Sequence, residues 1–456
     1  MQEKEDIGYW GIIKLVWPLA LGMMNNAIMQ FTDRAFLSRY SMSALEAILP
    51  ASMLSLILLG FFQMVVAYSG TFVAQYHGAK DERMCSASFR AGVVIALISG
   101  ILLFCSLPLG SLAFDLSGHS DEVRRLENGY FGICTSGGIF LLLQMAVSSY
   151  FTGRGKTRLV FAINLLGNIF NILLDPILIF GMFGLPSLGV SGAALATVLS
   201  MVLQCVLFAY CMFRERIEHR PWRVDLADKR FWGLVLRVLR FGLPSGAYSI
   251  LNISSFTIFV FITGRVSDVA FAVSNACFTI NYLFFTPMEG MGLGAATLVA
   301  QSQGRGDSAS ARKYAWRMVA MGAVLAFVFS VLSLIFYKPL LSIFASAVDP
   351  SHIDEFMDTG FILFLIMAAW QVFDGTDIVL SGALKGAGDT KFVMILLFVV
   401  AYVLWLPLVI ITARYISNTI PALWSTMIMY VVITSVASAI RWHRGRWEKI
   451  TVLMDK

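Results

Sequence analysis

Charged residues are scarce in this chain, since Asp, Glu, Lys and Arg together make up 14% of its 456 residues while hydrophobic residues make up 58%. A soluble domain usually holds roughly a quarter charged residues. Together with a mean hydropathy of +0.76, the shortage of charge excludes a soluble globular protein. The composition therefore indicates an integral membrane protein.

Residue types that serve metal or nucleophile chemistry are also few. The six cysteines include no CxxC pair, so neither a zinc site nor a disulfide framework is predicted. All five histidines fall in predicted loops or in the tail, and none has the spacing from an acid that a metal or acyl-transfer motif requires. Gly155-Lys156-Thr157 resembles the end of a phosphate loop, but Tyr150 stands where that loop needs its first glycine. The sequence predicts no enzyme, no cofactor and no ATP-driven mechanism.

Long apolar runs, in contrast, recur along the whole chain. Each has roughly 20 residues, enough to cross about 30 Å of hydrocarbon, and is too long and uniform for a barrel strand. We therefore expect an all-α integral membrane protein with twelve transmembrane helices. They lie near residues 12–36, 46–72, 91–113, 129–151, 159–183, 189–213, 241–263, 268–300, 315–337, 359–383, 391–413 and 421–440.

The basic residues predict the orientation of these helices. If the N-terminus is cytoplasmic, 27 of the 34 Lys and Arg residues fall in inner segments. The positive-inside rule therefore predicts a multi-pass protein of the inner (plasma) membrane with both termini in the cytoplasm. The same retention bias accounts for the net charge of +6, so no nucleic-acid partner is indicated. The N-terminus has no small-residue cleavage signature, so we expect the first helix to remain in the mature protein.

The two halves of the chain repeat each other 226 positions apart. Residues 71–81 return as residues 297–307 with six of eleven positions identical, and Pro18 corresponds to Pro244 in the same register. Duplicated bundles of this kind are common in transporters. We predict two pseudo-symmetric six-helix lobes. They comprise residues 1–213 and 241–440, joined by a charged cytoplasmic linker, 214–240, and followed by a basic cytoplasmic tail, 441–456.

Acids inside the predicted spans are the strongest candidates for function, because each charged group costs at least about 2.5 kcal/mol there. Asp33 lies in the first span, and Asn171 and Asp175 share one helix face of the fifth. Pro176 frees a backbone carbonyl one turn back. These oxygen atoms can hold Na⁺, or the carboxyls can share and release a proton. A buried network that only fixes helix packing is the alternative.

The second half has its acids in other places. Phe259 stands at the position of Asp33, so the first-half site is not duplicated. Glu289, which matches Gln63 of the first half, lies in the eighth span, and Asp374 and Asp377 lie in the tenth. Acids lining a cleft attract organic cations, helped by aromatic and methionine side chains. For Asp377 we instead expect a structural pairing with Lys385 near the inner surface.

Several short motifs in a fixed order are similar to those of the multidrug and toxic compound extrusion (MATE) family. The similarity covers essentially the whole chain. The motifs are Trp17-Pro18, Thr32-Asp33, Gln75-x-x-Gly78, Gly153-x-Gly155, Asn171-x-x-x-Asp175-Pro176, Gly189-x-x-Gly192 with Thr197, and Gly386-x-Gly388-Asp389-Thr390.

This resemblance implies two six-helix lobes around a V-shaped cleft and export of cationic or amphipathic compounds, driven by entry of Na⁺ or H⁺. It implies that Asp33, Asn171 and Asp175, joined by Thr197, form the coupling site, and that the first helix bends at Pro18. One branch of the family has a glutamate where this chain has Asn252, whereas Asp374 matches that branch's acid in the tenth span. The substrate-cleft candidates are Gln63, Asn252, Glu289 and Asp374.

The sequence thus predicts a secondary multidrug efflux antiporter that works by alternating access. We expect a monomer in the lipid bilayer whose partners are small organic cations or amphipathic drugs. A flippase for lipid-linked oligosaccharides is the alternative in the same superfamily, although it is expected to show a more basic cleft. A membrane-bound enzyme or sensor is a further alternative, but it needs a catalytic or ligand constellation that the sequence does not display.

Overall fold

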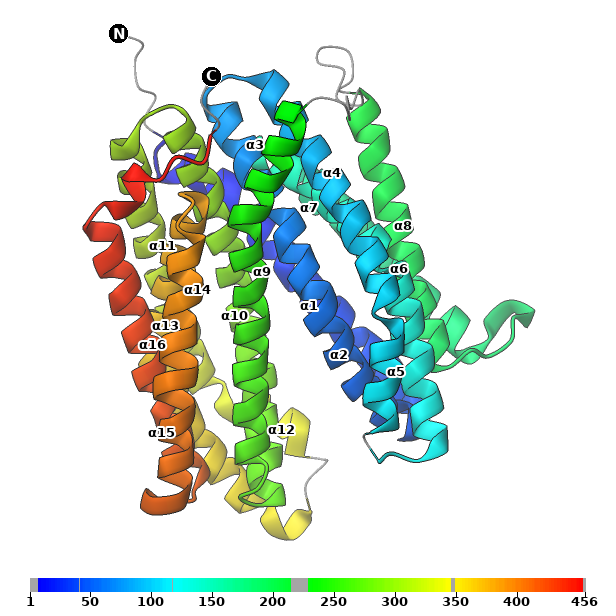
Figure 1. Ribbon diagram of the computed structural model, residues 1–456. Helices are drawn as coiled ribbons and strands as arrows, with labels where there is room; N and C mark the ends of the chain where they lie inside the picture. The colour runs from blue at the N-terminus through cyan, green and yellow to red at the C-terminus, as the bar shows by residue number, and fades with distance from the viewer. Residues whose placement is uncertain (1–6, 41, 117, 215–228, 346–348, 454–456) are drawn as a thin grey trace. The chain divides into compact units, whose positions relative to one another are not determined.

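The computed structural model describes residues 7–40, 42–116, 118–214, 229–345 and 349–453 (Figure 1), and these residues form helices joined by short turns. In the first half the α-helices are α1 (Tyr9–Tyr40), α2 (Met42–Ala67), α3 (Ser69–Gly78), α4 (Glu82–Cys105), α5 (Leu107–Asp115), α6 (Asp121–Gly153), α7 (Thr157–Phe180) and α8 (Val190–Arg214). In the second half they are α9 (Lys229–Thr263), α10 (Asp268–Gly304), α11 (Ser308–Ile335), α12 (Tyr337–Ala345), α13 (Ile353–Gly386), α14 (Thr390–Phe398), α15 (Leu406–Ile411) and α16 (Ile420–His443).

Short helical turns complete the described chain. The 3₁₀ turns are η1 (Met182–Gly184), η3 (Pro350–His352) and η6 (Arg446–Lys449), and the π-helical turns are η4 (Val399–Trp405) and η5 (Thr412–Ile416). The turn η4 immediately precedes Pro407, whose nitrogen has no hydrogen to donate to the carbonyl one turn back. A wider π-helical turn next to a missing bond lets the chain run on as a single span.

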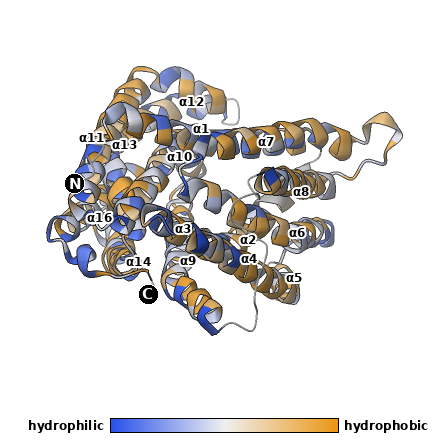
Figure 2. Cartoon of the chain, turned by 90° about the horizontal axis from the view of Figure 1, so that it is seen from above, coloured by the Kyte–Doolittle hydropathy of each residue, from blue (hydrophilic) through white to orange (hydrophobic). Residues whose placement is uncertain are grey.

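Twelve helical segments in the described part of the chain are long and apolar enough to cross a membrane. This number and the helical secondary structure confirm the predicted fold class. Three of the segments join two or more of the helices named above, as in Pro50–Gly78, which runs through α2 and α3. Hydrophobic residues cover most of the helical surface (Figure 2), as expected where helices must face hydrocarbon tails.

The described chain divides into two compact units. Unit 1 contains Met1–Ala20, Ile250–Gln303 and Asp307–Thr451, and unit 2 contains Leu21–Ser249, Gly304–Gly306 and Val452–Lys456. This division differs from the predicted lobes, because the first parts of α1 and α9 each pack in the unit formed mainly by the other half of the chain. In both helices the change of unit comes within a few residues after a proline, Pro18 or Pro244.

Small residues allow these exchanged segments to pack closely. In unit 1, a Cβ atom added to Gly290 of α10 would lie 2.5 Å from the Cα atom of Ala20 on α1. In unit 2, one added to Gly242 of α9 would lie 2.9 Å from the carbonyl oxygen of Val65 on α2. Backbone contacts of this kind are the main source of helix association in a bilayer, where the hydrophobic effect does not drive helices together.

The described parts of the predicted linker and tail include helical segments. Residues 229–240 of the predicted linker form the first turns of α9, and residues 215–228 lie outside the described residues. The first three residues of the predicted tail end α16, and the turn η6 follows. Inside unit 2, α6 packs against α2, α4 and α8, whereas in unit 1 α13 packs against α11 and α16.

The core of unit 1 is rich in aromatic rings. Phe259 stacks on Trp405 with ring centroids 5.2 Å apart, and Trp424 stacks on Trp370 at 5.7 Å. Both buried indoles have a hydrogen-bond acceptor, since Trp405 donates to Thr426 and Trp424 donates to Ser274. We refer to this group as the aromatic cluster; its members are Phe256, Phe259, Phe278, Trp370, Trp405, Trp424 and Tyr430.

Phe259→Ala should destabilise the protein by about 3–5 kcal/mol, because it leaves a cavity among rings that cannot easily collapse. The matched control is Phe261→Ala on the same helix, since Phe261 is 69% exposed and Phe259 is fully buried. Thermal unfolding of the purified variants, followed by tryptophan fluorescence, measures the difference. Equal stability of the two variants would show that the aromatic cluster does not hold unit 1 together.

Candidate ion-coupling site

The four residues predicted to form the coupling site lie together in unit 2. Asp33 projects from α1, Asn171 and Asp175 from α7, and Thr197 from α8. Asn171 and Asp175 are fully buried, and Asp33 and Thr197 are partly exposed. With its amide oriented to satisfy both neighbours, Asn171 donates to Oδ1 of Asp33 at 3.0 Å and accepts from the backbone N–H of Thr197 at 3.3 Å.

The carboxyl groups of Asp33 on α1 and Asp175 on α7 lie close enough to interact with each other. No donor among the described residues meets either carboxylate oxygen of Asp175. Two ionised carboxylates cannot bond to each other because both are acceptors, so this contact becomes a hydrogen bond only when one of them carries a proton. The pair therefore has a place for one proton, or for a cation, between the partly exposed carboxyl group of Asp33 and the fully buried one of Asp175.

A row of amide side chains on α7 extends this site. Asn168 donates to Oδ1 of Asn26 on α1 at 2.8 Å, and Gln204 on α8 donates to Oδ1 of Asn168 at 3.5 Å. One turn earlier, Gln144 on α6 donates to Asn164 at 3.0 Å. Together these bonds connect α1, α6, α7 and α8.

Sequence reasoning missed these amides although a signal was present. Asn164, Asn168, Asn171 and Asp175 follow each other at intervals of four, three and four residues in an otherwise apolar segment. This spacing places all four on one helix face. Such a polar stripe inside a span indicates contact with polar groups on neighbouring helices rather than with lipid.

The second half has no copy of the site among its described residues. Phe259, which occupies the position of Asp33 in the repeat, is fully buried in the aromatic cluster. The two halves therefore differ at this position, as expected from the sequence. Unit 2 has polar residues where α1 meets α7, and unit 1 has aromatic residues around α9.

Unit 1 has a second group of charged residues. Asp377 accepts hydrogen bonds from Ser438 at 2.7 Å and from Ser381 at 3.4 Å. Lys385 interacts electrostatically with Asp377, the pairing expected from the sequence, and with Glu289 as well. Asp374 interacts electrostatically with both acids. Glu289 of α10 thus interacts with Asp374 and Lys385 of α13, a contact that the sequence did not predict.

The remaining predicted residues fall on both units. Gln63 lies on α2 in unit 2 and is partly exposed, whereas Asn252 lies on α9 in unit 1. Glu289 on α10 is exposed although its helix spans the membrane. Pro18 is buried inside α1, which continues through it without interruption.

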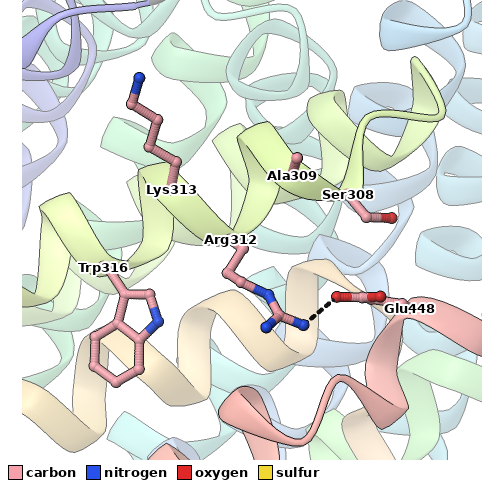
Figure 3. A pocket seen from close by; sticks show the side chains of 6 residues that line it. All are labelled: Ser308, Ala309, Arg312, Lys313, Trp316 and Glu448. Carbon is pink, nitrogen blue, oxygen red and sulfur yellow. Dashed lines mark hydrogen bonds and ion pairs between the residues drawn. The ribbon is translucent and has the colours of Figure 1, made fainter.

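A shallow pocket of about 550 Å³ lies in unit 1, away from all these residues (Figure 3). Arg312 of α11 makes an ion pair there with Glu448 of η6, which ties the C-terminal turn to the start of α11. None of the predicted site residues lines it. The lining residues are Ser308, Ala309, Arg312, Lys313, Trp316 and Glu448.

Comparison with known proteins agrees with the repeat of the two halves. The model of the MatE family matches residues 18–177 and 244–411, one match in each half of the chain. The chain belongs to the MatE family. The first match contains Asp33, Asn171 and Asp175, and the second contains Asn252, Glu289 and Asp374, so most of the predicted site residues fall within the family's shared region.

Relatives with similar sequences extend over almost the whole chain. A protein of Thermotoga maritima named "Probable multidrug resistance protein NorM" is 25% identical over 444 residues, which are 95% of this chain and 93% of that protein. A protein of Rhodopseudomonas palustris with the same name is 26% identical over 438 residues, 94% of this chain and 90% of that protein. The MatE chain is thus similar along its length to proteins named for multidrug resistance.

Solved structures agree on the fold. An outward-facing multidrug resistance MATE transporter of the MOP superfamily matches with a TM-score of 0.85 at 18% identity, covering 95% of this chain and 94% of that one. A MOP superfamily transporter from Pyrococcus furiosus, described as having a binding pocket of reverse polarity that suggests a different function, matches at 0.86 with 19% identity and covers 96% of both chains. At these identities the likeness concerns the fold alone.

Proposed function

We propose that this MatE protein is a secondary efflux antiporter that exports organic cations or amphipathic drugs in exchange for protons bound at the Asp33 and Asp175 pair. The observation that supports this most strongly is the pair itself: two carboxyl groups in reach of each other, with no donor from the described residues meeting Asp175. Two adjacent carboxyl groups inside a membrane span, one of them fully buried, are stable with one proton and costly with two negative charges.

The arrangement of Asn171 favours a proton over Na⁺ as the coupling ion. Na⁺ is bound by oxygen atoms, but the amide of Asn171 turns its N–H toward Asp33 and its oxygen toward the backbone of Thr197. The hydroxyl of Thr197 donates to the carbonyl oxygen of Ala193 at 3.0 Å. In this assigned orientation the N–H stabilises the Asp33 carboxylate once its proton has left, whereas it competes with a metal cation for the same oxygen.

Proton binding drives export only if it favours one conformation over the other. In the proposed cycle, substrate binds from the inner side while the pair is deprotonated. Protonation from the outer side then lowers the affinity for the substrate, which is released outward. Because binding linkage is reciprocal, substrate binding must lower the affinity for the proton by the same factor. Pro18 gives α1 a place to bend between the segment in unit 1 and the segment with Asp33 in unit 2.

Glu289→Gln should weaken binding of a monovalent organic cation by roughly tenfold, since a charge pair near a protein surface contributes on the order of 1–4 kcal/mol. Glu289 has the most exposed side chain among the acids of the group on α10 and α13, which supports it as the acid that meets an incoming cation. Glu355→Gln is the control, because Glu355 is exposed in the first turn of α13, outside this group. Titration of the purified protein with a fluorescent cation measures the affinity, and unchanged binding would remove Glu289 from the substrate site.

Export of a lipid-linked oligosaccharide is less well supported. A pyrophosphate group needs basic side chains to bind it. The candidate site residues within the spans include several acids, and the basic residue next to them, Lys385, interacts with two of these acids. The relatives along the whole length are named for multidrug resistance. We further propose that the protein acts as a monomer in the inner (plasma) membrane with both termini in the cytoplasm, which agrees with the distribution of its basic residues.

The proposal is tested with purified protein in liposomes loaded with a fluorescent organic cation, under an imposed pH gradient or, separately, a Na⁺ gradient. Efflux driven by the pH gradient alone is expected. Efflux driven by Na⁺ alone would replace the proton by Na⁺ in the scheme. If neither gradient moves any of the cations tried, the antiporter proposal fails.

A further inference from the structure

Three residues with metal-ligand chemistry meet where α3 turns into α4. His77 lies in the last turn of α3, Glu82 is the first residue of α4, and Cys85 follows one turn later. One ligand atom from each of the three lies within 4.8 Å of the other two. All three belong to unit 2 but lie outside the residues assigned above to coupling or to substrate.

The turn that positions them is well defined. Asp81 caps α4 by accepting from the backbone N–H of Met84 at 3.0 Å, and Lys80 adopts a positive φ of 58°. Few non-glycine residues adopt such a φ, so the surrounding contacts must hold this conformation. The ends of α3 and α4, and with them His77 and Glu82, are therefore fixed relative to each other.

The three side chains already contact one another or their surroundings through polar bonds. Nδ1 of His77 lies 3.1 Å from Oε1 of Glu82. The other carboxylate oxygen of Glu82 lies 3.2 Å from Nη2 of Arg154. Cys85 is fully buried, and its thiol donates to the carbonyl oxygen of Val73 at 3.5 Å. The cluster thus combines an imidazole, a carboxylate that Arg154 holds from its other oxygen, and a buried thiol.

We propose that His77, Glu82 and Cys85 form a Zn²⁺ site that ties the end of α3 to the start of α4. Imidazole nitrogen, carboxylate oxygen and thiolate sulfur are each zinc ligands, and three protein ligands leave a fourth position for water. On binding, the Cys85 thiol gives its proton to solvent, a bond forms between its sulfur and the zinc, and no electron is transferred. Arg154 then serves as the outer partner that orients the Glu82 carboxylate.

The geometry needs only a small adjustment. Zinc bonds of about 2.0–2.3 Å place tetrahedral ligand atoms roughly 3–4 Å apart. His77 and Glu82 already meet this spacing, and the sulfur of Cys85 lies within 4.8 Å of both ligand atoms, so it must move by about 1 Å. The thiolate of Cys85 and the carboxylate of Glu82 together balance the two positive charges of the zinc ion. The guanidinium of Arg154 leaves a local net charge of +1.

The competing interpretation is an ion-pair network of His77, Glu82 and Arg154 without a metal. The role of Cys85 distinguishes this network from a zinc site. An ion-pair network gives the thiol no role, whereas a zinc site requires it as thiolate. The second half of the chain has Gln303, Ser308 and Ala311 at the positions 226 residues later, which cannot form the same site. The proposal therefore predicts one metal ion per chain.

The test uses the purified full-length protein and Co²⁺ as a spectroscopic substitute for Zn²⁺. We expect one Co²⁺ per chain, a sulfur-to-cobalt charge-transfer band, and displacement of the band by Zn²⁺. Cys85→Ser should abolish the band, and His77→Gln should lower Zn²⁺ affinity by at least about tenfold. Cys277→Ser and His352→Gln are the controls, since Cys277 is likewise buried and His352 lies in η3 of unit 1.

Three results would overturn the proposal: no charge-transfer band in the wild-type protein, a band that survives Cys85→Ser, or equal losses in the control variants, which would indicate adventitious binding. Size-exclusion chromatography shows whether each variant is folded. If Cys85→Ser does not fold, His77→Gln decides the question on its own, because His77 is partly exposed and its loss leaves the buried packing of α3 unchanged. None of these measurements depends on transport.

Discussion

Asp33→Asn is expected to abolish efflux driven by a pH gradient while leaving the fold intact. The amide cannot take up and release a proton, so the two conformations would bind protons equally and the gradient could not bias them. Its side-chain oxygen can still accept from Asn171, which keeps the 3.0 Å bond seen with the carboxylate. Efflux from liposomes, normalised to the amount of folded protein, measures the effect.

Asp354→Asn is the matched control for this variant. Asp354 is an exposed acid in the first turn of α13, apart from the polar residues of unit 2. Full efflux is expected from it. If Asp33→Asn retained wild-type efflux, the coupling proton would have to bind elsewhere, and the acids of α10 and α13 would become the first candidates.

Asp175→Asn is expected to abolish coupling as well, but to make the protein more stable at high pH. In the wild type, raising the pH removes the shared proton and leaves two adjacent negative groups. The fully buried one, Asp175, has neither oxygen met by a donor from the described residues. In the variant, the new N–H can donate to Asp33 at any pH. Satisfying a buried polar group of this kind contributes roughly 1–3 kcal/mol.

Whether Asp175→Asn raises or lowers the stability at high pH distinguishes a proton-coupling pair from a network that only serves packing. Stability of the wild type should fall as the pH rises through the range where the pair deprotonates, and stability of Asp175→Asn should not. Thermal unfolding of both proteins at several pH values, with Asp354→Asn alongside, measures the difference. A variant that is less stable than the wild type at every pH would indicate that Asp175 serves packing instead.

Much of the fold could be predicted from composition and spacing alone. Apolar runs of sufficient length identify membrane helices because the bilayer sets the length, and the repeat around residues 71–81 and 297–307 identifies the duplication. The exchange of the first parts of α1 and α9 between the units could not be predicted. It depends on backbone contacts such as Gly290 against Ala20, and small residues in apolar helices do not reveal their partners.

The candidate sites show the same limit. The four-residue spacing of Asn171 and Asp175 predicts that they share a helix face, but it cannot tell which way the amide of Asn171 turns, and that orientation distinguishes a proton from Na⁺ in the proposal. His77, Glu82 and Cys85 follow no standard metal-binding spacing. Only the turn between α3 and α4, with its positive φ at Lys80, brings them together.

Proton release on substrate binding tests the central claim most directly. A saturating organic cation is added to the purified protein in weakly buffered detergent solution, and a pH-sensitive dye reports the protons released. The account predicts release of close to one proton per chain from the wild type, and none from Asp33→Asn or Asp175→Asn. Substrate binding without proton release from the wild type, or equal release from both variants, would contradict it.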